Sequence, residues 1–128
     1  MLTIKTYIAA SKISGLGLMA GEFIAKGDTV WKFQDGFDTV ISLEKFQLMP
    51  PIAQEYILHY GYCNEKEGGH ILCGDSARYT NHSTTPNIRA VGELIAVAIE
   101  DINIGDEITE DYFNFDELAQ SKLNTHGN

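Results

Sequence analysis

The chain has 128 residues, of which 44% are hydrophobic and 21% are charged, and its formal net charge is −9. This length suits a single domain that buries a core without needing disulfides or a metal ion. Because the chain has 18 acidic residues and only 9 basic ones, its surface should repel phosphates. This composition argues against direct nucleic-acid binding and favours a basic partner.

The first ten residues lack the continuous apolar core of a secretory signal, and no later run is long enough to span a membrane. The two cysteines, Cys63 and Cys73, stand in no C-x-x-C pair, which is typical of free thiols in a reducing compartment. We therefore expect a cytoplasmic protein that does not bind membranes.

Alternation of apolar with polar or small residues predicts two short strands near the start, over 4–8 and 16–20, with a Ser-Gly turn between them. Residues 23–33 place a Lys-Gly-Asp turn before a third strand, whose Trp31 we expect in the core. The same apolar-x-x-Gly-Asp-x-apolar pattern recurs at 102–108. We therefore expect two equivalent turns at strand entries.

Two short helices are predicted in the middle of the chain. Ser42 is placed to cap one that runs to Leu48, and Pro51 is placed in the first turn of a second with apolar residues at helical spacing. Two adjacent glycines at 68–69 are expected to end this helical insert. A hairpin is predicted at 91–94, and strands should dominate the remainder.

Polar side chains crowd into two segments, 74–87 and 105–112. The first brings Arg78, Asn81 and His82 within five positions, ahead of a Pro-Asn turn. Such directional hydrogen-bonding groups are typical of a binding site, although a well-capped turn has a similar composition. Local chemistry alone leaves both interpretations open.

Two further segments indicate ligand sites on weaker grounds. The glycines of 15–21 would let the backbone approach a ligand, but they lack the G-x-G-x-x-G spacing of a dinucleotide site. Side chains of His59, Cys63, His70 and Cys73 are suitable zinc ligands, yet their spacing matches no known zinc motif. We expect no metal site.

Three ordered motifs resemble those of SET-domain protein lysine methyltransferases, especially the short bacterial and viral members, over residues 3–116. Ser-Gly-Leu-Gly-Leu at 14–18 resembles the first cofactor motif of that family. Residues 78–87 resemble its R-F/Y-x-N-H-S-x-x-P-N signature, and residues 105–112 resemble its closing G-E-E-L-T-x-D-Y. Their order and separation make chance agreement improbable.

The resemblance implies a mostly β fold of small, β-clip-like sheets with a short helical insert. In that fold the segment after Asn81 and His82 joins a pseudoknot with the closing motif. We expect a single SET domain over 1–128, with a core of about 3–116 and a C-terminal tail of 117–128.

The resemblance also implies a site and a reaction. Tyr112 occupies the position of the catalytic tyrosine, and S-adenosylmethionine would be the methyl donor. The residues implied in cofactor binding are Gly15, Leu16, Gly17, Arg78, Asn81 and His82. The implied substrate is a lysine of a basic protein or peptide, histone-like or other, which agrees with the acidic composition.

The sequence departs from the family pattern at Glu110, where members usually carry an aromatic or apolar residue that shapes the lysine channel. The local pattern of Glu107, Glu110 and Asp111 fits a site for a cation or metal ion, but it favours a solvated face of an edge strand. Phe113 and Phe115 would close the channel in place of the zinc-binding cysteine cluster of larger members, or simply pack in the core.

Other functions fit the same residues. One is a non-catalytic SET-like module that binds the cofactor or a cationic peptide, and another is a small metal-dependent or sugar-binding sheet protein. Because a short domain lacks flanking elements that close its substrate groove, a homodimer is a further expectation.

Overall fold

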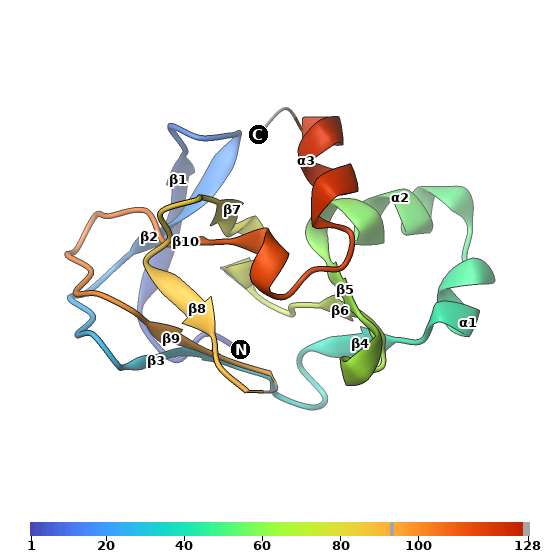
Figure 1. Ribbon diagram of the computed structural model, residues 1–128, viewed down its shortest axis with the longest axis horizontal. Helices are drawn as coiled ribbons and strands as arrows, with labels where there is room; N and C mark the ends of the chain where they lie inside the picture. The colour runs from blue at the N-terminus through green and yellow to red at the C-terminus, as the bar shows by residue number, and fades with distance from the viewer. Residues whose placement is uncertain (93, 127–128) are drawn as a thin grey trace.

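The computed structural model describes residues 1–92 and 94–126 as four small sheets with short helices (Figure 1). The elements in chain order are β1 (Thr6–Ala10), β2 (Leu16–Ala20), β3 (Thr29–Lys32), β4 (Thr39–Ile41), α1 (Leu43–Gln47), α2 (Pro51–Tyr60), β5 (Tyr62–Asn64), η1 (Glu65–Glu67), β6 (Gly69–Leu72), η2 (Ser76–Tyr79), β7 (Asn81–His82), β8 (Ile88–Ala90), β9 (Ile95–Ala98), β10 (Thr109–Glu110), η3 (Tyr112–Asn114) and α3 (Ala119–His126). The η elements are single 3-10 turns.

The sheets are small and mostly antiparallel. β1 and β2 form a ribbon, and two three-stranded sheets have the orders β3-β9-β8 and β4-β6-β5. β7 and β10 pair in parallel. The helices lie on the side of sheet β4-β6-β5, away from the ribbon (Figure 1). The mostly β fold with a short helical insert, predicted from the sequence, is confirmed.

The main core lies between β2 and sheet β3-β9-β8. Leu18, Val30 and Ala98 face each other there and are at most 2% exposed. Trp31 belongs to this cluster, as expected, and its ring also borders a cavity described below. Burial of apolar surface, worth about 25 cal/mol per Å², therefore holds the ribbon against the sheet.

The two Gly-Asp turns are equivalent, as the sequence predicted. Gly27 and Gly105 have φ angles of 93° and 91°, which glycine adopts without steric cost. Ile24 and Ile102 exchange backbone hydrogen bonds of 2.9 and 2.8 Å and are fully buried. The repeated pattern thus marks two segments that pair with each other across the core.

The starts of both predicted helices are confirmed. The hydroxyl of Ser42 accepts a hydrogen bond from the backbone N–H of Lys45 at 3.1 Å and caps α1. α2 begins at Pro51, where the missing N–H of proline costs nothing.

The end of α2 differs from the prediction. The helix stops at Tyr60 rather than at the glycines 68–69, because the chain enters β5 and pairs with β6. Gly61 makes this corner: a Cβ there would lie 2.8 Å from the carbonyl oxygen of Ile57 and 2.9 Å from that of Ile71. Long-range strand pairing therefore ends the helix.

The hairpin predicted at 91–94 joins β8 to β9, and the N–H of Val91 donates to the carbonyl of Ile95 at 2.9 Å. Glu93 lies outside the described residues. Helix α3 occupies most of the segment for which the sequence predicted only a tail. Within the described residues, no helix is long and apolar enough to cross a membrane.

Candidate active site

The two polar motifs of the sequence meet as a parallel pair of strands. Asn81 of β7 lies opposite Thr109 of β10, and His82 lies opposite Glu110. The side chain of Asn87 supports the junction, since its oxygen accepts the backbone N–H of Thr109 at 2.9 Å. Segments far apart in the chain thus form one rigid framework.

The side chain of Asn81 ties this framework to the glycine-rich segment. Its amide nitrogen lies 3.1 Å from the carbonyl oxygens of Ser14 and Leu16, and 3.0 Å from Oε2 of Glu107. The carboxylate of Glu107 also accepts the hydroxyl of Ser11 at 2.8 Å. Because Asn81 is buried, these bonds are shielded from water and fix the turn.

The phenol of Tyr112 lies beside both motifs. Its hydroxyl donates to the carbonyl oxygen of Thr80 at 2.7 Å, and its backbone N–H donates to Nδ1 of His82 at 3.2 Å. Burial, and then the charges of Asp116 and Glu110, raises the pKa of the Tyr112 phenol. The hydroxyl is therefore a neutral hydrogen-bond donor at physiological pH and not a base.

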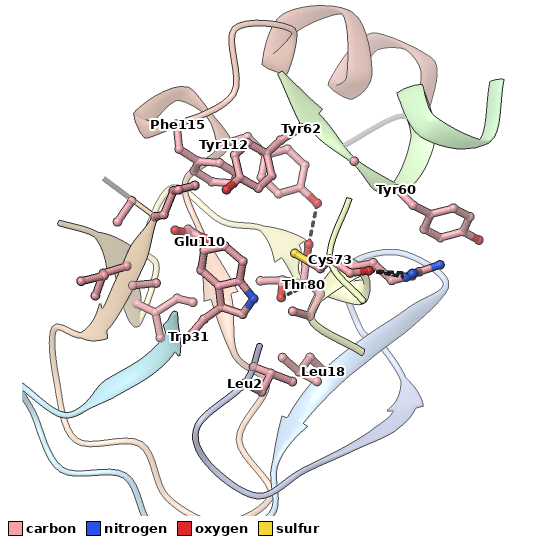
Figure 2. A pocket seen from close by; sticks show the side chains of 18 of the residues that line it. Leu2, Leu18, Trp31, Tyr60, Tyr62, Cys73, Thr80, Glu110, Tyr112 and Phe115 are labelled. Atoms are coloured by element: carbon pink, nitrogen blue, oxygen red, sulfur yellow. Dashed lines mark hydrogen bonds between the residues drawn. The ribbon is translucent and has the colours of Figure 1, made fainter. Parts of the chain in front are cut away.

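Two cavities adjoin at Tyr112. The larger cavity, of about 340 Å³, borders the glycine-rich turn at Gly15 and the side chain of Asn81. The smaller cavity, of about 90 Å³, lies on the side of Trp31 (Figure 2). The residues that line both cavities are His59, Tyr60, Arg78, Thr80, Tyr112 and Lys122. Two ligands bound in these cavities would meet at the phenol.

The smaller cavity has aromatic walls and is lined by two carboxyl groups, those of Glu67 and Glu110. Figure 2 shows Trp31, Tyr62 and Phe115 around it, together with Glu110. Burial raises the pKa of Glu110 to about 7, against a smaller lowering by the backbone N–H of Ala90.

The interpretation of the acidic segment as a solvated face is wrong for two of its three members. Glu107 is bonded to Ser11 and Asn81, and Glu110 lines the smaller cavity. The reason is that β10 is paired with β7 inside the molecule and is not an exposed edge.

Most of the predicted site residues come together. Those that line the larger cavity are Gly15, Leu16, Arg78, Asn81 and Tyr112. In the part of the chain that the structure describes, Gly17 and His82 border neither cavity. Gly17 packs against Glu107, and His82 lies behind Tyr112 with ring centroids 5.3 Å apart. Direct contact of these two residues with a cofactor stays a prediction.

The guanidinium of Arg78 is held by the protein itself. Two of its nitrogens donate to the carbonyl oxygen of Cys73, at 2.6 and 3.2 Å, and a third donates to the hydroxyl of Tyr56. Arg78 thus presents a fixed positive edge to both cavities.

Sequence reasoning missed three residues of the shared wall. Thr80 contributes a backbone carbonyl, which no side-chain pattern reveals. Tyr60 is the last residue of α2, and the apolar spacing of a helix gives no sign of a binding role. Lys122 lies in the predicted tail, and its Nζ reaches back to the carbonyl oxygen of Gly61 at 2.5 Å. The sequence around Lys122 carries no signal for this contact.

Among residues 1–92 and 94–126, no group of three or more His, Cys, Asp or Glu side chains is arranged to hold a metal ion. Cys63 and Cys73 are buried free thiols. Burial raises the pKa of Cys73 to about 12, so this thiol stays protonated.

The family model named SET domain matches residues 15–113, which include both polar motifs and Tyr112. The chain belongs to the SET domain family. The resemblance found in the sequence is confirmed. Histone-lysine N-methyltransferase 2D of Homo sapiens and its Mus musculus counterpart are each 33% identical to it over 133 residues. This alignment covers 94% of the chain but only 2% of each relative.

Solved structures share the fold. The Neurospora SET domain protein DIM-5, a histone lysine methyltransferase, superposes with a TM-score of 0.60 at 24% identity, over 87% of this chain and 53% of its own. Polycomb Repressive Complex 2 of Chaetomium thermophilum, in an autoinhibited conformation bound to S-adenosylmethionine, superposes with a TM-score of 0.61 at 21% identity. The superposition covers 95% of this chain and 17% of the other.

Substituting Gly17 tests how the SET domain holds its glycine-rich turn. In Gly17→Ala the new Cβ would lie 2.6 Å from Oε2 of Glu107, so the carboxylate must leave Ser11 and Asn81. We expect a loss of about 1–3 kcal/mol in the free energy of unfolding, measured in urea. The double variant Gly17→Ala/Glu107→Ala should lie close to Glu107→Ala alone, because only the 3.0 Å contact of the new Cβ with Cβ of Ser11 remains. A further loss in the double variant as large as that of Gly17→Ala would show that Glu107 is not the cause.

Proposed function

We propose that this SET domain transfers methyl groups from S-adenosylmethionine to lysine side chains of a basic protein or peptide. One observation carries the proposal: a larger and a smaller cavity adjoin at Tyr112, which lines both. The larger has the size of a small-molecule site, and the smaller suits the end of a lysine side chain.

The larger cavity fits the cofactor in chemistry as well as size. Its walls include the rings of Tyr60 and Tyr79, which suit a planar purine, and the guanidinium of Arg78, which suits a carboxylate. Backbone carbonyls of the glycine-rich turn lie at its edge. When bound, S-adenosylmethionine supplies an activated methyl group on a sulfonium centre.

The smaller cavity fits the other reactant. A lysine must lose its proton before it can attack, and with a free pKa near 10.4 this costs about 4.6 kcal/mol at pH 7. Apolar walls and a neighbouring sulfonium charge both favour the neutral amine. Tyr112, bonded to Thr80, would then hold the amine in line with the methyl group.

Histones are the first substrates to test. A net charge of −9 attracts basic segments, and the named relatives are histone-lysine methyltransferases.

We also propose a cytoplasmic location, where the thiols stay reduced. Imaging of a tagged chain would check it.

A homodimer is a further part of the proposal. Leu48 and Ile52 are apolar and 81% and 79% exposed, and a second copy would pack against them. Sedimentation at increasing protein concentration measures the association.

The deciding experiment is intact-mass and peptide mass spectrometry of core histones after incubation with the protein and S-adenosylmethionine carrying a deuterated methyl group. We expect labelled methyl groups on lysine. Calorimetry with the cofactor runs in parallel. Cofactor binding without labelled lysine in any histone would favour the non-catalytic module, and no cofactor binding would refute the proposal.

A further inference from the structure

Glu110 occupies an unusual place for a charged side chain. It lies in β10 two residues before Tyr112, and its carboxyl group lines the smaller cavity (Figure 2). Removing a carboxylate from water is costly unless a cation or hydrogen bonds compensate it. Among residues 1–92 and 94–126, Glu110 takes part in no ion pair, and the N–H of Ala90 is the hydrogen bond that stabilises its charge.

The cations of the cavity wall are already engaged. The ammonium of Lys122 is paired with Asp116 at 2.7 Å, and the guanidinium of Arg78 is bonded to Cys73 and to Tyr56. The titratable and charged groups that line the cavity with Glu110 are His59, Tyr60, Tyr62, Glu67, Cys73, Arg78, Tyr112 and Lys122. A cation that enters the cavity from outside therefore finds an uncompensated carboxylate.

A second observation indicates that the cavity receives a polar group. Trp31 is 8% exposed and lines the cavity, and its indole N–H is buried without a hydrogen-bond partner among the described residues. Buried donors in folded proteins are almost always paired. An unpaired donor in the same wall as Glu110 is consistent with a ligand that carries polar atoms, and not with a purely apolar one.

We propose, as a step that rests on the proposed function, that the carboxylate of Glu110 accepts the proton that the substrate lysine must lose before methyl transfer. The ammonium N–H bond breaks and an O–H bond forms on Glu110. The amine lone pair then attacks the methyl carbon, and the carbon–sulfur bond breaks with its electron pair remaining on sulfur. The products are a methylammonium side chain and a neutral thioether. Glu110 returns its proton to solvent.

The ionisation states of the groups that line the cavity suit this role. Burial raises the pKa of Glu110 to about 7. Near neutral pH, Glu110 can therefore accept a proton as the carboxylate and release it again as the carboxylic acid. Burial also raises the pKa of the Tyr62, Cys73 and Tyr112 groups, which stay protonated. It lowers the pKa of His59, which is neutral at pH 7.

The first test measures Glu110 directly, without turnover. The side-chain carboxyl carbon of Glu110 is followed by NMR across pH, and its signal is assigned by its loss in Glu110→Gln. We expect a pKa of about 7, falling when n-butylammonium, a mimic of the lysine end, saturates the cavity. Uncharged 1-butanol should leave it unchanged. A pKa of Glu110 below about 5, or no response to n-butylammonium, would overturn the proposal.

The second test is the pH dependence of kcat/KM with core histones as methyl acceptors. In the wild type, kcat/KM should rise as Glu110 ionises and level off above about pH 8. In Glu110→Gln it should rise about tenfold per pH unit towards pH 10, following the neutral lysine. We expect the wild type to exceed the variant about 100-fold near pH 8 and less than about tenfold near pH 9.5.

The controls separate this proposal from the proposed function. Glu100→Gln, in an exposed turn after β9, should match the wild type, and Glu110→Asp should retain the wild-type shape of the pH profile at reduced rate. A wild-type to Glu110→Gln ratio that is constant over pH would assign Glu110 a packing role and refute proton transfer. A wild type that binds no S-adenosylmethionine and methylates no histone lysine refutes the proposed function, while the NMR titration still decides the behaviour of Glu110.

Discussion

Replacing Tyr112 by phenylalanine is expected to lower kcat by about 10²–10³-fold while changing the dissociation constant of S-adenosylmethionine by less than about threefold. The substitution removes one hydroxyl, whose hydrogen bond to Thr80 places it where the two cavities adjoin. The ring remains and still fills its space against His82 and Phe115. A group that acts only when both reactants are present should affect turnover and leave cofactor binding nearly intact.

The measurement combines steady-state kinetics on core histones with calorimetry of cofactor binding. Tyr7→Phe is the matched control, because Tyr7 lies on β1 and is 47% exposed, and we expect wild-type kinetics from it. If Tyr112→Phe loses cofactor affinity in the same proportion as turnover, Tyr112 supports the binding site and has no specific role in methyl transfer.

Replacing Asp116 by asparagine is expected to lower the free energy of unfolding by about 3–5 kcal/mol. The Asp116 side chain is fully buried and accepts the backbone N–H groups of Cys63 and Leu118 at 3.1 and 3.0 Å, as well as the ammonium of Lys122 at 2.7 Å. The Lys122 side chain is 9% exposed, so Asp116→Asn leaves a buried ammonium without its counter-charge.

Urea unfolding of Asp116→Asn, Lys122→Met and the double variant measures this pair as a cycle. The double variant should be more stable than Asp116→Asn, since no buried charge is left unpaired. Glu100→Gln, in the exposed turn after β9, should change stability by less than about 0.5 kcal/mol. An Asp116→Asn variant with the wild-type midpoint would show that α3 is held by other contacts.

This second prediction also bears on the site. Lys122 and Leu123 of α3 line the larger cavity, so the pair with Asp116 holds the helix over the proposed cofactor position. Asp116→Asn should therefore weaken binding of S-adenosylmethionine along with stability. Tyr112→Phe should not, which distinguishes the two variants in one calorimetric series.

Features that depend on neighbours in the chain were predictable. The cap at Ser42, the start of α2 at Pro51 and the turns at Gly27 and Gly105 are set within a few residues, by hydrogen bonds and by the φ angles that glycine allows. The polar motifs were also recognisable, because the side chains of a site such as Asn81 must keep their identity and order.

Features that depend on contacts between distant segments were not predictable from the sequence. The end of α2 at Gly61 follows from pairing of β5 with β6. The docking of α3 follows from hydrogen bonds that join Lys122 to Gly61 and Asp116 to Cys63, which are distant in the chain. A sequence pattern reports the preference of each segment alone, whereas these outcomes depend on which surface comes to cover it.

Glu110 shows most directly the difference between what the sequence determines and what the tertiary structure determines. By itself the sequence determined the family, a mostly β fold and part of the site around Tyr112, because the order of the motifs and the local turns can be recognised from neighbouring residues. Only the tertiary structure decided that Glu110, typical of an exposed edge by its polarity, lines a cavity together with Trp31 and Phe115. Desolvation is a property of what surrounds a group, so its pKa and its proposed chemistry exist only in the folded protein.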